Sequence, residues 1–581
     1  MVPEVSRSTL VALAVLLGGM APLACASDSA SPESIGTSGS SDGAAPTDGA
    51  TDARDDLDAV SRADAAPHAA DADAPDAAVP DADAPDAAGP LPYPTRSAYR
   101  LKALQPDFWP NKDDVSGNNT GGVAMNLTWL SWEPAKKAPP CDATTEEEYD
   151  GHCFVLQALF DQTILDWTTR GLVVTGVVYG VPAWARAGRV CSPAAAGYEI
   201  FCAPNDPTDY GRFVGFLAHH YDGKQGHGRV ADFVIDNEVN SNDWFDIGCG
   251  QGTACDTNAW LDTYAASYES AYDAAMKEQS TAKVLISLEH SFLVTDAPAA
   301  QHPLLSGATF LTGFAARVAP RAWHVAYHPY APNLFSPVFS PDDDPIVGYG
   351  NIGILAGWLR KNFPNVPSSW DIELTESGIN SLGAQSSSAA QASAVCDTLR
   401  NVTGTPGISN YVYHRMVDSA AEGGLGLGLH DVNSVAKPAW AVWALANRSD
   451  LNPPQLSCGF ENLPYTRLDR SSSPTRGHWA STRIAPSGFA LEQSYRIFRD
   501  EQPGTVMLYE CRSGQHNLVS PDVSCEGLET LGPLGYAYTA QAAGTEALYR
   551  CRIGAGTDHF ISTSAACEGQ TVEQLLGYVL P

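Results

Sequence analysis

The pattern of apolar and polar residues predicts alternating strands and helices across the middle of the chain. Between residues 91 and 451, short apolar runs alternate with longer stretches of helical periodicity. The expected strands are residues 122–127, 172–179, 230–235, 283–288, 323–327, 370–374 and 409–413, with a first strand near 99–104. The expected helices include residues 154–169, 210–221, 259–277, 352–363 and 389–401. This alternation is typical of βα units around a parallel sheet.

Eight such units in one stretch of chain predict a (β/α)₈ TIM barrel with long loops over residues 91–451. A doubly wound sheet is the structural alternative. No G-x-G-x-x-G motif follows any of the expected strands, so a dinucleotide-binding fold has no support.

Residues 458–581 have a different pattern, with internal repeats. The tetrapeptide at 508–511 (LYEC) recurs at 548–551 (LYRC), and the CEG and LGY motifs of the same copy also recur. A degenerate first copy begins near Leu468 and lacks both cysteines. Three copies predict a small all-β, threefold-repeat domain, and a trefoil is one such fold. They resemble a repeat found at the ends of secreted bacterial enzymes. Contact with a glycan or cell wall is one interpretation, and a stabilising appendage is the other.

The N-terminus has the pattern of an export signal. The apolar run at residues 10–17 follows Arg7 and is too short to span a bilayer. Cleavage after Ala26 would release a secreted protein. Cleavage before Cys25, followed by acylation, would give an outer-surface lipoprotein with residues 1–25 as its signal region. The long polar stretch that follows favours the lipoprotein interpretation.

Residues 26–90 are rich in Ala, Asp, Pro, Ser and Gly and contain the tandem units DADAPDAAVP and DADAPDAAGP. Such a segment buries too little apolar surface to fold, so we expect a disordered linker, either a spacer or a tolerated tail. It holds fifteen Asp and Glu against two Arg, a large part of the net charge of −33. This acidity argues against nucleic acid and leaves a lipid anchor as the only expected membrane contact.

The thirteen cysteines support export. Setting Cys25 aside, ten fall in neighbouring pairs: Cys141/Cys153, Cys191/Cys202, Cys249/Cys255, Cys511/Cys525 and Cys551/Cys567. Cys396 and Cys458 are left over, with an open pairing. Short loops between cysteines predict disulfides in an oxidising compartment. No pair has C-x-x-C spacing, so neither a structural metal nor a cofactor is expected.

Two of the expected strands lead into a glutamate. The fourth is followed by Asn237-Glu238-Val239-Asn240, and the seventh by Thr375-Glu376-Ser377-Gly378. This layout resembles the clan A retaining glycoside hydrolases over residues 91–451. The same strings, with His328-Pro329-Tyr330 and Tyr413-His414-Arg415, are similar to an uncharacterised cellulase-like barrel family.

The resemblance implies a role for each matching residue. Glu238 would be the acid/base and Glu376 the nucleophile of a double displacement on an extracellular polysaccharide or oligosaccharide. Asn237 would bind the sugar 2-hydroxyl, and His328 and Tyr330 would orient Glu376. Trp184 and Trp244 are candidate surfaces for sugar stacking. His290, His414 and Arg415 are expected to point into the same cleft.

Other interpretations stay open. The barrel could be a carbohydrate-binding surface protein without turnover, or a scaffold whose activity lies in the C-terminal repeats. Asp342-Asp343-Asp344 is expected to be a solvated acidic loop rather than a calcium site. His219-His220 shows no cysteine or carboxylate pattern in the sequence that would indicate a metal.

Overall fold

The computed structural model describes residues 89–95, 101–191, 198–446, 458 and 464–581. The expected signal region and acidic linker lie outside these residues. None of the described helices is long and apolar enough to cross a membrane.

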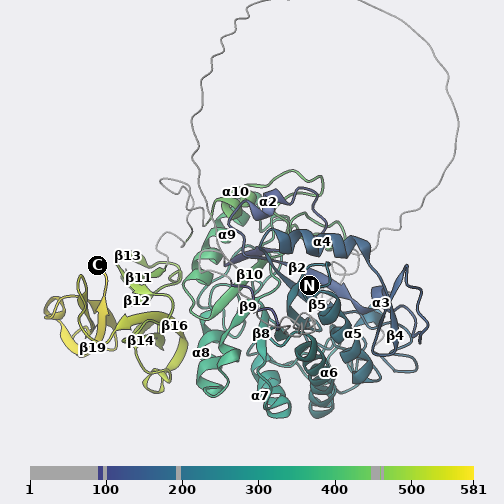
Figure 1. Ribbon diagram of the computed structural model, residues 1–581. Helices are drawn as coiled ribbons and strands as arrows, with labels where there is room; N and C mark the ends of the chain where they lie inside the picture. The colour runs from purple at the N-terminus through teal and green to yellow at the C-terminus, as the bar shows by residue number, and fades with distance from the viewer. Residues whose placement is uncertain (1–88, 96–100, 192–197, 447–457, 459–463) are drawn as a thin grey trace, which may run out of the picture. The chain divides into compact units, whose positions relative to one another are not determined.

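Eight parallel strands close into a barrel in the order β1-β10-β9-β8-β7-β6-β5-β2 (Figure 1). The strands are β1 (Lys102–Leu104), β2 (Gly122–Thr128), β5 (Val173–Tyr179), β6 (Val230–Ile235), β7 (Lys283–Glu289), β8 (His324–His328), β9 (Ile372–Leu374) and β10 (Ile408–Tyr413). The (β/α)₈ prediction is therefore confirmed and the doubly wound alternative is wrong. All six residues of β6 are buried, because a strand inside a barrel is covered on both faces.

Helices surround the strands (Figure 1). They are α4 (Ala158–Thr169), α5 (Pro207–His220), α6 (Thr257–Glu278), α7 (Gly307–Val318), α8 (Gly353–Asn362), α9 (Ser388–Thr403) and α10 (Pro438–Leu445), with the single turns α2 (Asp113–Ser116) and α3 (Trp129–Trp132). Short 3₁₀ turns are η2 (Tyr198–Phe201) and η3 (Pro367–Trp370). Asp206 caps α5 through the Thr208 amide, and Asp256 caps α6 through the Asn258 and Ala259 amides, so side chains set these helix starts.

One expected helix begins later than its pattern suggested. Residues 152–155 form β4 (His152–Val155), which pairs with β3 (Glu146–Tyr149) in an antiparallel hairpin before α4 begins. The Cys141–Cys153 disulfide ties this hairpin to the preceding loop. The apolar residue Phe154 fits a buried strand as well as a helix, so the pattern could not separate the two.

The C-terminal residues form three antiparallel units of three strands each. They are β11 (Tyr465–Ser473), β12 (Gly477–Ser481) and β13 (Ala490–Phe498); β14 (Thr505–Ser513), β15 (His516–Ser520) and β16 (Glu529–Tyr538); and β17 (Glu546–Arg552), β18 (His559–Ser562) and β19 (Thr571–Val579). The CEG motifs form the 3₁₀ turns η5 (Cys525–Gly527) and η6 (Cys567–Gly569). In each unit the first strand pairs with both others. A β domain after the barrel is confirmed.

One equivalent position on the first strand of each unit forms an ion pair with another unit. Arg550 pairs with Glu526 at 2.6 Å, and Arg470 pairs with Glu568 at 2.7 Å. In the third pair a glutamate, Glu510, occupies the strand position of the two arginines. It pairs at 2.5 Å with Arg483, which lies two residues after β12 rather than in a CEG turn.

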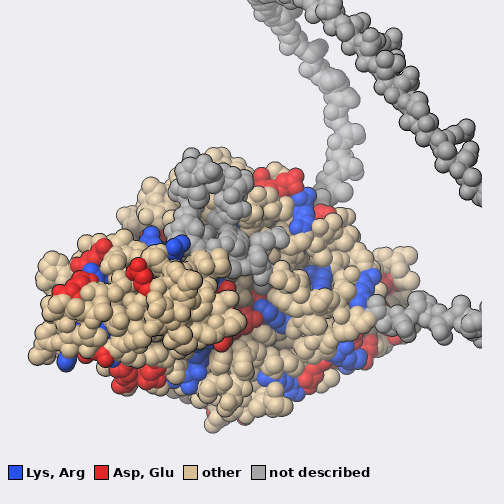
Figure 2. Space-filling view, turned by 60° about the vertical axis from the view of Figure 1, so that its left-hand side comes forward, with Lys and Arg blue, Asp and Glu red and all other residues tan. Residues whose placement is uncertain are grey.

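Side chains of the repeats also contact the barrel. The buried Arg499 guanidinium donates to the carbonyls of Thr403 and Ile408, at 3.1 and 2.5 Å. Asp342, in the acidic loop expected to be solvated, pairs with Arg476 at 3.0 Å and with Arg512 at 3.4 Å. That loop therefore forms ion pairs with the β domain. Small groups of acidic and basic side chains adjoin one another on the face shown in Figure 2.

The twelve cysteines within the described residues form six disulfides. Five join the neighbouring pairs Cys141–Cys153, Cys191–Cys202, Cys249–Cys255, Cys511–Cys525 and Cys551–Cys567. The sixth joins the two cysteines left over, Cys396 on α9 and Cys458. Six disulfides are consistent with an oxidising, extracellular environment.

Candidate functional site

Both glutamates lie just beyond the carboxyl ends of barrel strands. Glu238 follows β6 and Glu376 follows β9, the fourth and seventh strands of the barrel. The carboxyl ends of the strands in such a barrel open at one mouth, where catalytic groups collect. Both residues are buried, with 5% and 8% of their surface exposed. Burial of two carboxyl groups at one barrel mouth is costly without partners, so their partners matter.

The turn that carries Glu238 has an uncommon backbone. Asp236 and Glu238 have φ angles of +57° and +42°. The Glu238 amide donates to Ser287 Oγ of β7 at 3.0 Å, and the Asp236 amide donates to the Val178 carbonyl of β5 at 2.9 Å. Hydrogen bonds to both neighbouring strands hold this left-handed conformation, which other residues than glycine adopt rarely. The orientation of the Glu238 side chain is therefore set by backbone hydrogen bonds to the barrel strands.

Strand β8 and the turn after it supply a partner for each glutamate. His328, its last residue, is hydrogen-bonded through Nδ1 to Glu238 Oε1 at 2.8 Å. The Tyr330 hydroxyl donates to Glu376 Oε1 at 2.9 Å. The sequence analysis expected His328 to orient Glu376. The structure places it against Glu238 instead, while its Nε2 lies 3.1 Å from Thr375 Oγ1, beside Glu376.

The environment of Glu238 favours its protonated form. Burial raises the pKa of Glu238 to about 7, the charges of Glu376 and Glu289 add to the rise, and the His328 hydrogen bond opposes it. Burial would lower the pKa of His328, but the hydrogen bond with Glu238 and the surrounding carboxylates raise it. A proton is therefore retained near neutral pH on the Glu238 side of the site.

Two further side chains of the turn formed by Asp236, Asn237 and Glu238 are buried. Burial raises the pKa of Asp236 to about 8, so this carboxyl group is largely protonated at neutral pH. Asn237 is 2% exposed, and its Oδ1 has no hydrogen-bond partner within the described chain. A buried acceptor without a partner destabilises the fold, and a bond from a ligand hydroxyl would remove that cost. Asn237 Oδ1 is available for such a bond.

A pocket of about 230 Å³ opens beside Glu238. Its lining includes Ser241, Trp244, Glu289, His290, Asp296, His302 and Tyr330. Trp244 packs edge-on against Phe201, with ring centroids 4.7 Å apart. A larger cavity, of about 600 Å³, is lined by Leu101, Lys283 and Ile408, at the amino ends of their strands and away from the glutamates.

Trp184 lies in a different environment from Trp244. Its indole N–H donates to the Glu133 carbonyl at 2.9 Å, its ring meets Trp129 edge-on, and Lys136 Nζ lies 5.2 Å from its ring centroid. It does not line the 230 Å³ pocket among the described residues. Its packing anchors the loop after β5.

Arg415 joins the loops after β1 and β10. Its guanidinium contacts Asp107 at 2.7 Å and Glu422 at 3.0 Å. The preceding His414 is bound to Gln105 at 2.8 Å. Both side chains are thus held by charged or polar neighbours. Burial raises the pKa of Tyr179 at the end of β5, the charge of Glu376 adds to the rise, and the charge of Arg415 opposes it.

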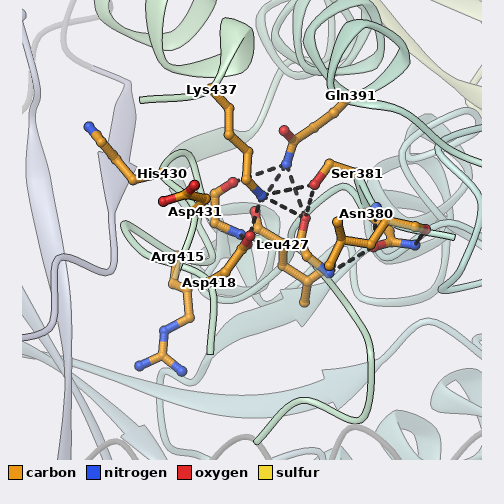
Figure 3. A network of polar contacts seen from close by, with 12 residues as sticks. Asn380, Ser381, Gln391, Arg415, Asp418, Leu427, His430, Asp431 and Lys437 are labelled. Carbon is orange, nitrogen blue, oxygen red and sulfur yellow. Dashed lines mark hydrogen bonds and ion pairs between the residues drawn. The ribbon is translucent and has the colours of Figure 1, made fainter. Parts of the chain in front are cut away.

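A buried network supports the loop that carries Arg415 (Figure 3). Lys437 Nζ donates to Asp418 Oδ1 at 2.7 Å, to Ser381 Oγ at 2.9 Å and to the Gly426 carbonyl at 3.2 Å. Gln391 Nε2 donates to the carbonyls of Gly426 and Gly428. Burial lowers the pKa of Lys437 and raises that of Asp418. Each group would therefore favour its neutral form if the other were removed.

Sequence reasoning missed several groups of the pocket. Glu289 is the last residue of β7, and its side chain accepts from Asn240 Nδ2 at 3.0 Å. His302 Nδ1 lies 2.9 Å from an oxygen of Asp243. Glu289 had the same signal as Glu238 and Glu376, a glutamate at a strand end. Asp243 and His302 stand 59 residues apart in long loops, where no sequence pattern joins them.

Comparisons with solved structures found remote similarities. A family 39 glycoside hydrolase from the gut symbiont Bacteroides cellulosilyticus WH2 shares 13% identity, with 84% of this chain and 82% of that one covered and a TM-score of 0.41. A GH39 enzyme from Xanthomonas axonopodis pv. citri shares 14% identity, with 70% and 90% covered and a TM-score of 0.41. A β-glycosidase from Thermosphaera aggregans shares 13%, with 57% and 84% covered and a TM-score of 0.37. At this level nothing about activity follows.

A search of curated proteins found no match to the chain. A protein-family model does match, and it spans residues 94–452, the barrel and its loops. Since this is more than half of the sequence, the chain belongs to the family of unknown function DUF5722.

Proposed function

We propose that the barrel is a retaining glycoside hydrolase that acts on an extracellular polysaccharide or oligosaccharide. The observation that carries this proposal is the pair of buried glutamates with different partners at one barrel mouth. Glu238 has a pKa raised to about 7 and contacts His328, whereas Glu376 accepts from Tyr330. A retaining hydrolase needs one protonated and one ionised carboxyl group on opposite sides of the scissile bond.

Each glutamate then has one role in each half of the reaction. In the first half, Glu238 donates its proton to the glycosidic oxygen while Glu376 attacks the anomeric carbon, so the C–O bond to the leaving group breaks. In the second half, Glu238 takes a proton from water, and that water displaces Glu376 from the sugar. Tyr330 holds the attacking carboxylate, and Asn237 Oδ1 is available to a sugar hydroxyl. Trp244 presents an aromatic side chain to the pocket.

The test compares the wild type with Glu376→Gln and Glu238→Gln on a panel of aryl glycosides and polysaccharides. We expect sugar release by the wild type and a loss of at least about a thousandfold in Glu376→Gln. Glu529→Gln, an exposed change in the β domain, is the matched control. A fluorinated sugar that traps the covalent intermediate should label Glu376, as detected by peptide mass spectrometry.

Two results would reject the proposal. Equal turnover by the wild type and Glu376→Gln would remove Glu376 as nucleophile. Glycan binding without sugar release by a folded wild type would favour the alternative, a carbohydrate-binding surface protein that retains the barrel. Export, lipid anchoring at Cys25 and glycan contact by the C-terminal repeats belong to the same proposal. Labelling with a palmitate analogue in wild type and Cys25→Ala would test the anchor.

A further inference from the structure

A cluster of histidines and carboxylates lies far from the barrel mouth. Asp161 is on α4, His220 is the last residue of α5, and His227 lies in the loop that leads to β6. The donor atoms of these three side chains all lie within 4.8 Å of one another. The carboxyl end of α5 is connected by a short loop to the amino end of β6. The cluster therefore lies toward the amino ends of the strands, away from the glutamates.

The three donors come close enough to share one ion. His220 Nε2 lies 3.1 Å from Asp161 Oδ1, and His227 Nδ1 lies 3.7 Å from Asp161 Oδ2. The two imidazole rings stack with centroids 4.0 Å apart. Two imidazoles and a carboxylate are ligands typical of zinc and related transition metals, whereas calcium and magnesium prefer oxygen alone.

Neighbouring groups already orient the donors. Glu147 Oε2 lies 2.6 Å from Nδ1 of His220, on the side of the ring away from Asp161. The Tyr221 hydroxyl donates to Asp161 Oδ1 at 2.9 Å. A carboxylate on the second nitrogen of a ligating histidine is the usual support of such a metal site, because it fixes the ring and raises its basicity.

The loop that carries His227 is pressed against α4 by a glycine. Gly228 has a φ of +84°, and a Cβ there would lie 2.7 Å from the Ile164 backbone. Gly226, on the other side of His227, has a φ of +88° and open space around it. The close approach brings His227 to Asp161. The side chain of His227 is 35% exposed, which leaves it free to turn from stacking to coordination and leaves room for a water ligand.

We propose that Asp161, His220 and His227 bind a zinc-type divalent transition metal, with Glu147 supporting His220. The ion takes the place of the proton that His220 Nε2 presents to Asp161. It links α4, α5 and the loop before β6, three segments that are otherwise joined here by hydrogen bonds. The expected effect is on stability rather than on the glycosidase chemistry proposed above.

The experiment uses the purified full chain, treated with a chelator and dialysed, with thermal unfolding and calorimetric titration as readouts. We expect Zn²⁺ to bind with one-to-one stoichiometry and to raise Tm, and Mg²⁺ to do neither. His227→Ala should keep the Tm of the zinc-depleted wild type and bind Zn²⁺ at least about tenfold more weakly. Glu147→Gln should weaken binding about 10–100-fold.

His516→Gln is the control, because His516 lies on β15 of the C-terminal repeats and is bonded there to the Thr557 carbonyl. It should bind Zn²⁺ as the wild type does. The visible absorption of bound Co²⁺ gives a second readout, which should be lost in both His227→Ala and Asp161→Asn. Wild-type Zn²⁺ affinity in both of these variants, or no Zn²⁺ binding by the wild type, would overturn the proposal. Neither readout depends on hydrolase activity.

Discussion

At the scale of single residues, the partners of Glu238 and Glu376 distinguish two chemically similar side chains. Both glutamates follow a barrel strand and both are buried. The difference arises from β8 and the turn after it, where His328 places an imidazole on Glu238 and Tyr330 a phenol on Glu376. A phenol donates a hydrogen bond to an ionised carboxylate, whereas a histidine can exchange a proton with its partner.

The pH dependence of turnover should reflect the pKa of Glu238. Because this group must be protonated to act as the acid, kcat/KM should fall about tenfold per pH unit above its pKa of about 7. The His328 hydrogen bond lowers that pKa, so His328→Gln should move the falling limb to higher pH. A pH–rate profile on an aryl glycoside measures both. His302→Gln, which changes another pocket histidine, should leave the limb in place; an unmoved limb in His328→Gln would contradict this account.

At the scale of elements, buried charged pairs hold loops and repeats in place. Lys437 fixes the loop after β10 through Asp418 (Figure 3). Glu510 and Arg483 close the ring of ion pairs between the repeats. A buried pair contributes little net stability, yet the loss of one member leaves the other charge uncompensated.

Removal of the Lys437 charge should therefore be costly. Lys437→Met leaves Asp418 buried without its cation and should lower the free energy of unfolding by about 3–5 kcal/mol. The double variant Lys437→Met/Asp418→Asn should recover part of that loss, since it removes both charges. Urea denaturation of the two variants checks this. A double variant no more stable than Lys437→Met would contradict this account.

The exchanged ion pair of the repeats allows a sharper test. Glu510→Arg alone places a second cation beside Arg483 and should destabilise the β domain by about 3–5 kcal/mol. Adding Arg483→Glu reverses the pair, so that arginine occupies the strand position as it does in the other two pairs. The double variant should therefore recover much of the stability. A double-mutant cycle followed by thermal unfolding measures the coupling, and additive losses would mean that Glu510 and Arg483 are not coupled.

At the scale of the whole molecule, covalent links and ion pairs connect segments that are distant in sequence. The Cys396–Cys458 disulfide closes a separation of 62 residues, the longest of the six disulfides. Arg476 and Arg512 of the repeats reach Asp342 in the loop after β8. The barrel and the repeats therefore support one another.

Loss of the Cys396–Cys458 disulfide should destabilise the protein, because the unfolded chain then gains conformational entropy. The chain-entropy relation for a loop of this length gives about 4 kcal/mol, so Cys396→Ser/Cys458→Ser should show a clearly lower Tm. Cys249→Ser/Cys255→Ser, with a separation of six residues, is the control and should lose less. Thermal unfolding under oxidising conditions compares them. Equal losses would indicate that native-state strain or packing outweighs loop entropy at these sites.

Much of the architecture could be predicted because it depends on local patterns. The short run at 230–235, between two helical stretches, favoured a strand buried on both faces, and β6 has these bounds. Repeated motifs indicated equivalent units before any contact was known. The catalytic roles of Glu238 and Glu376 stay predictions. Trp184 shows the limit, since a strand-end tryptophan packs against a loop as readily as against a ligand, and only its neighbours decide which.

The sequence on its own was enough for the order of the eight barrel strands, the neighbouring disulfides and the two glutamates at strand ends, because periodicity and short covalent loops are local properties. The tertiary structure alone decided that His328 contacts Glu238 rather than Glu376, and that Asp342 pairs with the repeats. It also decided that Asp161, His220 and His227 converge. Such contacts join residues from separate elements, so they depend on the closure of the barrel and on how its loops pack.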